Sequence, residues 1–366
     1  MKLTCSRDAL LNGINIVSKA VSNRTTLPIL ECILLKTYDD GFKMTGNDLE
    51  LGIKTALINA EIEKQGSVAL EAKLFSDIIR RVDGETVCIS CDNNNAVVLS
   101  CGKSEFKIMG QSGDDFPEIP TVEQSFAYTL KQKALREMIT ETIFSIAMDE
   151  SKPQLTGELI EIKGNNINIV AVDGYRISYK RATVSETEIP VKVIVPGKTL
   201  KEISKILSQD EEDVDLYITD KHILFDLQGN IIVSRLIEGD FIKYDQTFTE
   251  EFKTRVLIDR TDLISSLERA SLVSRDARKV PVKIDIQKDK MIITSQTEMG
   301  TAYEEVRLDA EGDTLKIAFN PKYLIDALRA IEEDKISIQF NTALSPCIIK
   351  PEEGDIYKYL VLPLRI

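Results

Sequence analysis

The chain has a single histidine, His222, among its 366 residues, and this scarcity narrows the possible chemistry. Nucleophilic and general-base catalytic sites usually recruit an imidazole, so most of their arrangements are disfavoured. No apolar run approaches the roughly 20 residues that a membrane helix needs. The amino-terminal stretch reaches polar residues before a signal-type apolar core can form. We therefore expect a cytoplasmic protein that does not bind a membrane.

Cysteine is also sparse, with six residues in a long chain that shows no secretory signal. Disulfide staples are not expected under those conditions, so the thiols should be reduced. Cys88 and Cys91 form a CxxC, but they lie in an alternating, strand-like stretch and lack the second pair of a zinc site. We expect neither a metal nor a cofactor.

The composition is that of a globular protein, with 43% hydrophobic and 29% charged residues. A chain of this length is too long for one ordinary core and suggests two or three domains. The net charge of −13 argues against a protein that simply coats nucleic acid.

Internal repetition is the strongest signal in the sequence. The stretches "KLFSD" at 73–77, "KTLKE" at 198–202 and "KYLID" at 322–326 share one pattern and lie 125 and 124 residues apart. Each follows an apolar strand-like run and opens an amphipathic helix. A second helix with apolar i, i+4 pairs precedes each of them, and alternating stretches joined by turns lie between the two helices.

This pattern predicts an α+β fold made of three tandem copies of a unit with two helices and roughly eight strands. We expect the copies to span 1–120, 121–248 and 249–366. Basic residues equal or outnumber acidic residues in all six expected helical segments: 7–24, 73–83, 131–149, 198–207, 260–279 and 321–331. A basic helix layer on an acidic protein favours contact with a polyanion, although a solvated helix face would show the same balance.

The motifs "TLPIL" at 26–30, "TGNDLE" at 45–50, "DDFP" at 114–117, "DGYR" at 173–176 and the ending "LPLRI" carry a resemblance. Together with the threefold repeat, they resemble the bacterial sliding clamp family, the β subunit of DNA polymerase III. The resemblance implies a head-to-tail homodimer that closes a ring of twelve helices around double-stranded DNA. At about 10 Å spacing, twelve helices would leave a bore of roughly 28 Å, which admits a duplex.

The function implied by the resemblance is that of a DNA sliding clamp and replication processivity factor without catalysis of its own. It would tether the replicative DNA polymerase, the clamp loader, and repair and translesion proteins through short peptides. The peptide pocket carried over from the family comprises Leu155, Val172, Gly174, Tyr175, Arg176, Ile177, Ile242, Asn320, Tyr323, Leu344, Pro346, Leu360, Leu362, Pro363, Leu364 and Arg365. Apolar side chains would form the groove, and Arg176 and Arg365 would bond the peptide backbone or close the rim. In this interpretation Asp173 is a turn residue.

The resemblance also implies two further sets of residues. The candidates for contact with DNA are basic: Arg24, Lys152, Lys198, Arg275, Arg278 and Lys279. The dimer seam would pair one edge with a second edge on the other copy, and its members are Lys103, Phe106, Lys107, Leu272, Val273, Glu304 and Glu305. Apolar residues at the centre and opposite charges at the rim suit such an interface.

Two other classes of protein stay open. A hydrolase could use Asp173, although it would need a second carboxylate at a fixed distance. An interaction scaffold that ignores DNA would share the repeats but remain an open arc.

Overall fold

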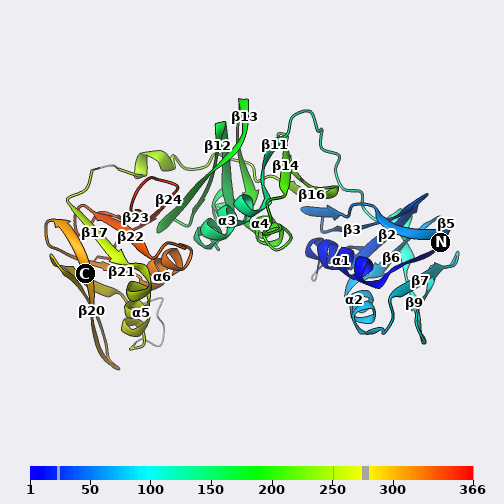
Figure 1. The fold of residues 1–366 in the computed structure, drawn as a ribbon, viewed down its shortest axis with the longest axis horizontal. Helices are drawn as coiled ribbons and strands as arrows, with labels where there is room; N and C mark the ends of the chain where they lie inside the picture. Colours follow the sequence, from blue (N-terminus) through cyan, green and yellow to red (C-terminus); the bar gives the residue numbers. More distant parts are fainter. Residues whose placement is uncertain (23–24, 250, 274–279, 366) are drawn as a thin grey trace. The chain divides into compact units, whose positions relative to one another are not determined.

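The computed structural model describes residues 1–22, 25–249, 251–273 and 280–365. They form two compact units, drawn in Figure 1. The first unit combines Met1–Gln132 with Lys205–Leu236, and the second combines Lys133–Ser204 with Ile237–Ile366. The central repeat is divided between them because its strands join two different sheets.

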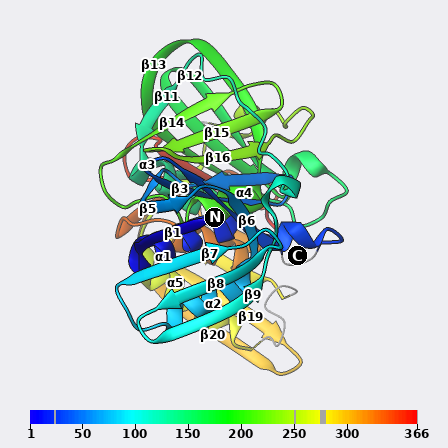
Figure 2. The ribbon, with the colours of Figure 1, turned by 90° about the vertical axis from the view of Figure 1, so that its right-hand side faces the viewer.

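The first unit is built on an antiparallel sheet whose main path runs β11-β14-β15-β16-β4-β3-β5-β1-β7-β8-β9, with β2, β6 and β10 attached. Strands β7, β8 and β9 lie side by side, and β9 ends the path (Figure 2). The strands of this sheet are β1 Lys2–Ser6, β2 Cys32–Tyr38, β3 Gly41–Asn47, β4 Leu51–Lys54, β5 Ile58–Lys64, β6 Ser67–Glu71, β7 Thr86–Cys91, β8 Ala96–Cys101, β9 Ser104–Met109, β10 Gln111–Ser112, β11 Tyr128–Lys131, β14 Asp213–Ile218, β15 His222–Leu227 and β16 Asn230–Arg235.

Helices α1 (Arg7–Val17) and α2 (Ala72–Arg81) pack against each other on this unit (Figure 1). The Ser6 hydroxyl accepts a hydrogen bond from the Ala9 amide at the start of α1, and the Glu71 carboxylate caps α2 in the same way. Met44 on β3 is fully buried and faces Gly13 of α1. Because strand side chains alternate, the neighbouring β3 residues lie on the face opposite α1.

The second unit holds a ten-stranded antiparallel sheet in the order β12-β13-β24-β23-β22-β17-β20-β19-β18-β21. Strand β13 of the central repeat pairs directly with β24 of the third repeat, so the sheet continues across the repeat boundary. The strands are β12 Gly157–Val172, β13 Arg176–Pro196, β17 Thr254–Asp259, β18 Val282–Ile286, β19 Lys290–Thr297, β20 Gly300–Gly312, β21 Leu315–Phe319, β22 Lys335–Phe340, β23 Cys347–Pro351 and β24 Tyr357–Val361.

Four helices belong to the central and third repeats: α3 (Gln132–Thr142), α4 (Gly197–Ile203), α5 (Arg260–Ser271) and α6 (Pro321–Arg329). Helices α5 and α6 pack together over a core that includes Leu263, Leu267, Leu324 and Leu328. The six α-helices of the described chain, two from each repeat, confirm the predicted α+β class with three two-helix copies.

Several helices are shorter than the segments expected from the sequence. Helix α3 ends at Thr142, whose hydroxyl donates to the Met138 carbonyl, and a 3-10 turn, η4 (Ile143–Ser145), follows. The expected segment 131–149 was therefore too long, because apolar spacing continues through a tighter turn. Short 3-10 turns also occur at η1 Ser18–Ala20, η2 Pro28–Glu31, η3 Gly113–Asp115, η5 Pro153–Leu155 and η6 Tyr244–Thr247.

No helix in the described chain is long and apolar enough to cross a bilayer. Its six cysteines are free thiols. Burial raises the pKa of Cys5 and of Cys347 to about 12, so both thiols stay protonated near neutral pH.

Candidate functional site: a groove at the seam of two repeats

A groove of about 470 Å³ opens in the second unit where β13 meets β24. The paired residues Ile177 and Leu360 line it from adjacent strands of the continuous sheet. Pro346 and Leu362 add apolar surface from the third repeat. Such a concave apolar site suits a short apolar peptide segment.

The groove brings together nine of the predicted pocket residues: Val172, Gly174, Tyr175, Arg176, Ile177, Ile242, Pro346, Leu360 and Leu362. Leu155 lies in the core cluster beneath them and is buried. Ile242 forms part of the wall and adds an aliphatic side chain to it.

Six other predicted members lie outside the lining. Asn320 caps α6, because its side-chain oxygen accepts a hydrogen bond from the Lys322 amide. Leu344 is 73% exposed beside the groove. Tyr323 stacks on Tyr175 at 6.1 Å, so it supports a groove residue from outside. The remaining three follow Leu362 on the C-terminal tail, namely Pro363, Leu364 and Arg365.

The tail itself is held in place by backbone hydrogen bonds. The Leu362 amide donates to the Tyr175 carbonyl at 2.9 Å, and the Leu364 amide donates to the Ala318 carbonyl at 2.8 Å. The first of these bonds fixes Leu362 against the end of the β12–β13 hairpin.

Sequence reasoning missed nine lining residues: Thr247, Thr249, Glu251, Phe252, Gln339, Phe340, Asn341, Ser345 and Ile348. Four of them, Thr247, Thr249, Glu251 and Phe252, come from the end of η6 and the segment after it, where the chain passes from the central to the third repeat. A signal in that segment was Phe252, an aromatic residue between charged neighbours, and it is 43% exposed in the structure.

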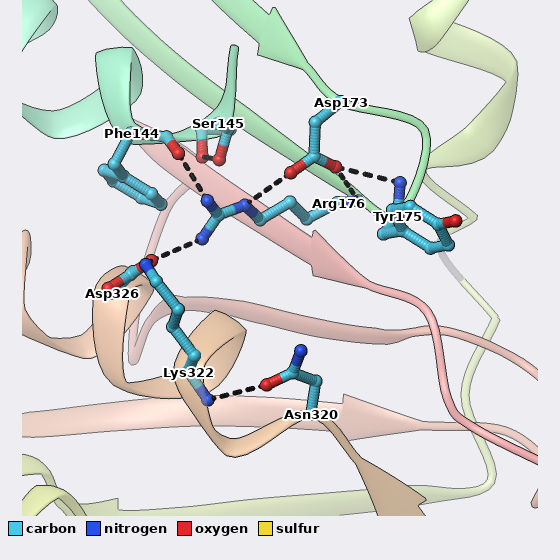
Figure 3. Close-up of polar contacts among 9 residues, drawn as sticks. Phe144, Ser145, Asp173, Tyr175, Arg176, Asn320, Lys322 and Asp326 are labelled. Atoms are coloured by element: carbon cyan, nitrogen blue, oxygen red, sulfur yellow. Dashed lines mark hydrogen bonds and ion pairs between the residues drawn. The ribbon is translucent and has the colours of Figure 1, made fainter. Parts of the chain in front are cut away.

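Arg176 is the most heavily bonded side chain at the groove (Figure 3). Its Nε donates to Asp173 Oδ2 at 2.9 Å and its Nη1 donates to Asp326 Oδ2 at 2.8 Å. Its Nη2 donates to the Phe144 carbonyl, and the guanidinium lies 4.6 Å from the centre of the Tyr323 ring. The side chain is only 8% exposed, so these groups hold it beneath the groove surface.

This geometry gives Arg176 a structural role within the chain that the sequence did not predict. The sequence suggested a hydrogen bond to a bound peptide backbone or closure of the rim, whereas the guanidinium joins the central repeat to α6 of the third repeat. The planar guanidinium group carries five N–H donors, so it can form hydrogen bonds to three partners at once.

Asp173 closes the turn before Arg176. Its Oδ1 accepts hydrogen bonds from the Tyr175 amide at 2.9 Å and the Arg176 amide at 3.0 Å. Gly174 between them has φ of +91°, a conformation that side chains rarely adopt. This tight turn presents Tyr175, which is 58% exposed, at the edge of the groove.

The candidate DNA contacts are only partly described. Lys198 is exposed at the start of α4, and Lys152 is exposed just before η5. Arg24, Arg275, Arg278 and Lys279 lie outside the described residues.

The candidate dimer residues lie at two sheet edges. Phe106 and Lys107 belong to β9, which ends its sheet, and Lys103 lies in the turn before it. Glu304 and Glu305 lie on the half of β20 that pairs only with β19. Leu272, at the end of α5, is 79% exposed, and the Val273 carbonyl accepts a hydrogen bond from Thr297.

Both acidic residues of this set already have partners within the chain. Glu304 Oε2 lies 2.6 Å from Arg269 Nη2, and hydrogen bonding to Arg269 lowers the pKa of Glu304. Glu305 pairs with Lys290 at 3.2 Å. In a dimer, a basic residue of the second copy would therefore meet glutamates that already form ion pairs within their own chain.

Three repeats of a two-helix, antiparallel sheet unit and an apolar groove at a repeat seam define a binding protein of the DNA clamp class. Family models match the chain in order: the DNA polymerase III beta subunit N-terminal domain over residues 1–120, its central domain over 129–243 and its C-terminal domain over 245–365. The chain belongs to the DNA polymerase III beta subunit family.

Individual relatives agree with this membership. The chain is 34% identical over 375 residues to a beta sliding clamp of Staphylococcus epidermidis, covering 100% of this chain and 99% of that protein. The solved DNA polymerase sliding clamp of Bacillus subtilis is 31% identical, with a TM-score of 0.96 and coverage of 100% and 99%. A structure assigned to the same subunit in Eubacterium rectale is 43% identical, with a TM-score of 0.95 and full coverage of both chains.

Proposed function

We propose that the chain is a DNA sliding clamp and processivity factor: two copies close head to tail around duplex DNA and hold partner proteins through the groove. The observation that carries this proposal is the ordered match of all three family domains along the whole chain. The family is one of accessory polymerase subunits, so the chain acts by binding and not by catalysis. A hydrolase built on Asp173 is set aside, because that carboxylate is used in a turn and an ion pair.

Retention by encirclement explains the overall charge. A closed ring needs weak, sequence-independent attraction on its inner surface and does not need tight phosphate contacts. The exposed Lys198 and Lys152 fit the inner role, and the remainder of an acidic chain would repel DNA. The division into domains 1–120, 121–248 and 249–366 and a place in the cytoplasm are parts of the same proposal.

The dimer would form by pairing β9 of one copy with the free half of β20 of the other. An exposed strand edge offers unpaired backbone donors and acceptors to a second chain. Phe106 and Tyr303 supply exposed apolar surface on these strands, at 38% and 60% exposure. Sedimentation at micromolar concentration should show a dimer, and Phe106→Asp should shift it toward a monomer.

The groove is the proposed site for partner peptides from the replicative polymerase, the clamp loader, and repair and translesion proteins. Its apolar walls would take apolar peptide side chains, and Gly174 allows a close backbone approach. Arg176 would act indirectly, by fixing the Asp173 turn that positions Tyr175.

Primer extension on a long, singly primed template tests this function, with the replicative polymerase and clamp loader present. The wild-type chain should lengthen the products, whereas Leu362→Ala should shorten them because it removes a groove wall. Leu57→Ala is the matched control, since Leu57 is an exposed leucine of the first repeat that does not line the groove. Equal loss of product length in both variants would contradict the groove assignment.

A further inference from the structure

The first repeat carries a second cavity, of about 410 Å³, on the sheet face opposite α1. Three lysines from adjacent strands line it: Lys36 on β2, Lys43 on β3 and Lys54 on β4. The clamp function proposed above uses none of them.

The sheet register places these charges close together. Lys36 and Lys43 are directly opposed across the β2–β3 pair, and Lys54 is opposed to Thr45, two residues beyond Lys43 on the same face. Like charges in directly opposed positions destabilise a sheet. None of the three ammonium groups has an ion-pair or hydrogen-bond partner within the described ranges 1–22, 25–249, 251–273 and 280–365.

Hydroxyl groups accompany the lysines. Ser67 is opposed to Lys36 on the neighbouring strand, and Tyr38 and Thr45 line the same cavity. Asp114 and Glu118 contribute to the lining from the segment that follows β10, but both are exposed and neither pairs with a lysine in the described structure. The lining keeps more positive than negative groups.

The matching face of the central repeat is closed by its own side chains. At the positions 125 residues after Lys36, Lys43 and Lys54 stand Glu161, Asn168 and Tyr179. The Tyr179 hydroxyl donates to Asn168 at 2.9 Å, and Glu161 accepts a hydrogen bond from Tyr244 at 2.6 Å. In the part of the chain that the structure describes, the same register therefore holds a hydrogen-bonded network in the central repeat and three lysines without ion-pair partners in the first repeat.

We propose that this lysine cavity binds a compact, phosphate-bearing anion. A phosphate group accepts hydrogen bonds from several donors at once, and lysine ammonium groups and hydroxyls can supply them without fixed geometry. The bound anion would remove the repulsion between Lys36 and Lys43. Anion binding would therefore also remove the destabilisation that this opposed pair causes in the sheet.

Isothermal titration calorimetry with sodium tripolyphosphate at low ionic strength tests the proposal. The wild-type chain should bind it saturably, with one lysine-cavity site per chain. The double variant Lys36→Gln with Lys43→Gln should weaken that binding at least tenfold, and Lys54→Gln alone should weaken it less. Lys64→Gln, an exposed lysine on β5 of the same repeat, should leave it unchanged.

The free double variant should melt no lower than the wild-type chain, because the substitution removes a repulsive pair and no attractive contact. ATP should bind at the same site, since it carries the same phosphates, while citrate should bind at least tenfold more weakly than tripolyphosphate. The proposal is overturned by an absence of saturable binding, by undiminished binding to the double variant, by equal loss in Lys64→Gln, or by citrate binding as tightly as tripolyphosphate.

Discussion

Asp48 in the first repeat and Asp173 in the central repeat close the same turn, 125 residues apart. Each carboxylate accepts hydrogen bonds from the amides two and three residues later. The residue after the aspartate has a positive φ in both turns, but it is Gly174 in the central repeat and Leu49, at +74°, in the first. Two residues after the positive-φ position, Arg176 matches the buried Leu51.

The two repeats thus keep one backbone design and differ in the side chains that it carries. In the central repeat the turn bears Arg176, which ties it to α6 and shapes the edge of the groove. In the first repeat an apolar residue takes that place, and the open polar cavity lies elsewhere on the sheet. The comparison shows that the repeats share their backbone turns and strand registers. Side-chain differences at matched positions determine which repeat boundary forms a binding site.

The largest effect should come from exchanging Arg176 for its counterpart, as Arg176→Leu. This variant leaves Asp173 without its buried cation, which should lower the free energy of unfolding by about 3 to 5 kcal/mol. Urea denaturation measures the loss. Lys322→Met is the control, because Lys322 pairs with the same Asp326 but is 46% exposed, and it should cost about 1 kcal/mol or less. Equal costs would show that Arg176 has no special structural role.

Glu158 gives the second comparison, since its counterpart is the fully buried Ile33. Glu158 is also fully buried, and its carboxylate oxygens lack a hydrogen-bond partner in the described structure. Burial raises the pKa of Glu158 to about 8. The folded chain therefore keeps a proton that the unfolded chain releases near pH 4.5, and stability contributed by this group is lost as the pH rises from about 4.5 to 8.

Glu158→Ile should remove that loss. We expect the variant to be more stable than the wild-type chain by about 4 kcal/mol at pH 8 and by about 1 kcal/mol at pH 5. Denaturation midpoints at the two pH values measure the difference. A gain that is independent of pH would mean that packing alone, and not the proton, sets the cost of Glu158.

The smallest effect concerns the positive-φ position. Gly174→Ala should cost about 1 kcal/mol from backbone conformation alone, because a methyl group at Gly174 meets no atom within 4 Å. Leu49→Gly should change stability by less, since relief of strain is offset by the greater freedom of glycine in the unfolded chain. Thermal unfolding of both variants tests this, and a larger penalty at Leu49 than at Gly174 would contradict the matched-turn interpretation.

Much of the fold followed from the repeat in the sequence. The three related stretches do open helices, at Ala72, Gly197 and Pro321, because each strand-to-helix junction repeats in local sequence. The groove residues of the β12–β13 hairpin were accessible through the "DGYR" resemblance. By contrast, the direction of the Arg176 guanidinium depends on Asp326, which lies 150 residues away, and no local pattern carries that information.

The burial of individual side chains was the other property that could not be predicted from the sequence. Glu158 lies in "GELIEIK", where an acidic residue suggests exposure, yet it shares a strand face with Ile160 and Ile162 and is buried with them. Thr247, Thr249, Glu251 and Phe252 were missed for a similar reason, since a connecting segment has no period that identifies the side facing a groove. The lysine cavity required the strand register, which places Lys36 opposite Lys43.

Retention on DNA tests the central claim most directly. The chain, loaded onto a nicked circular plasmid by the clamp loader, should stay bound through gel filtration in high salt, because a closed ring cannot leave a circle. Cutting the plasmid once with a restriction enzyme should release it, since the ring slides off the ends. Equal retention on circular and linear DNA would show adhesion instead of encirclement and would contradict the account.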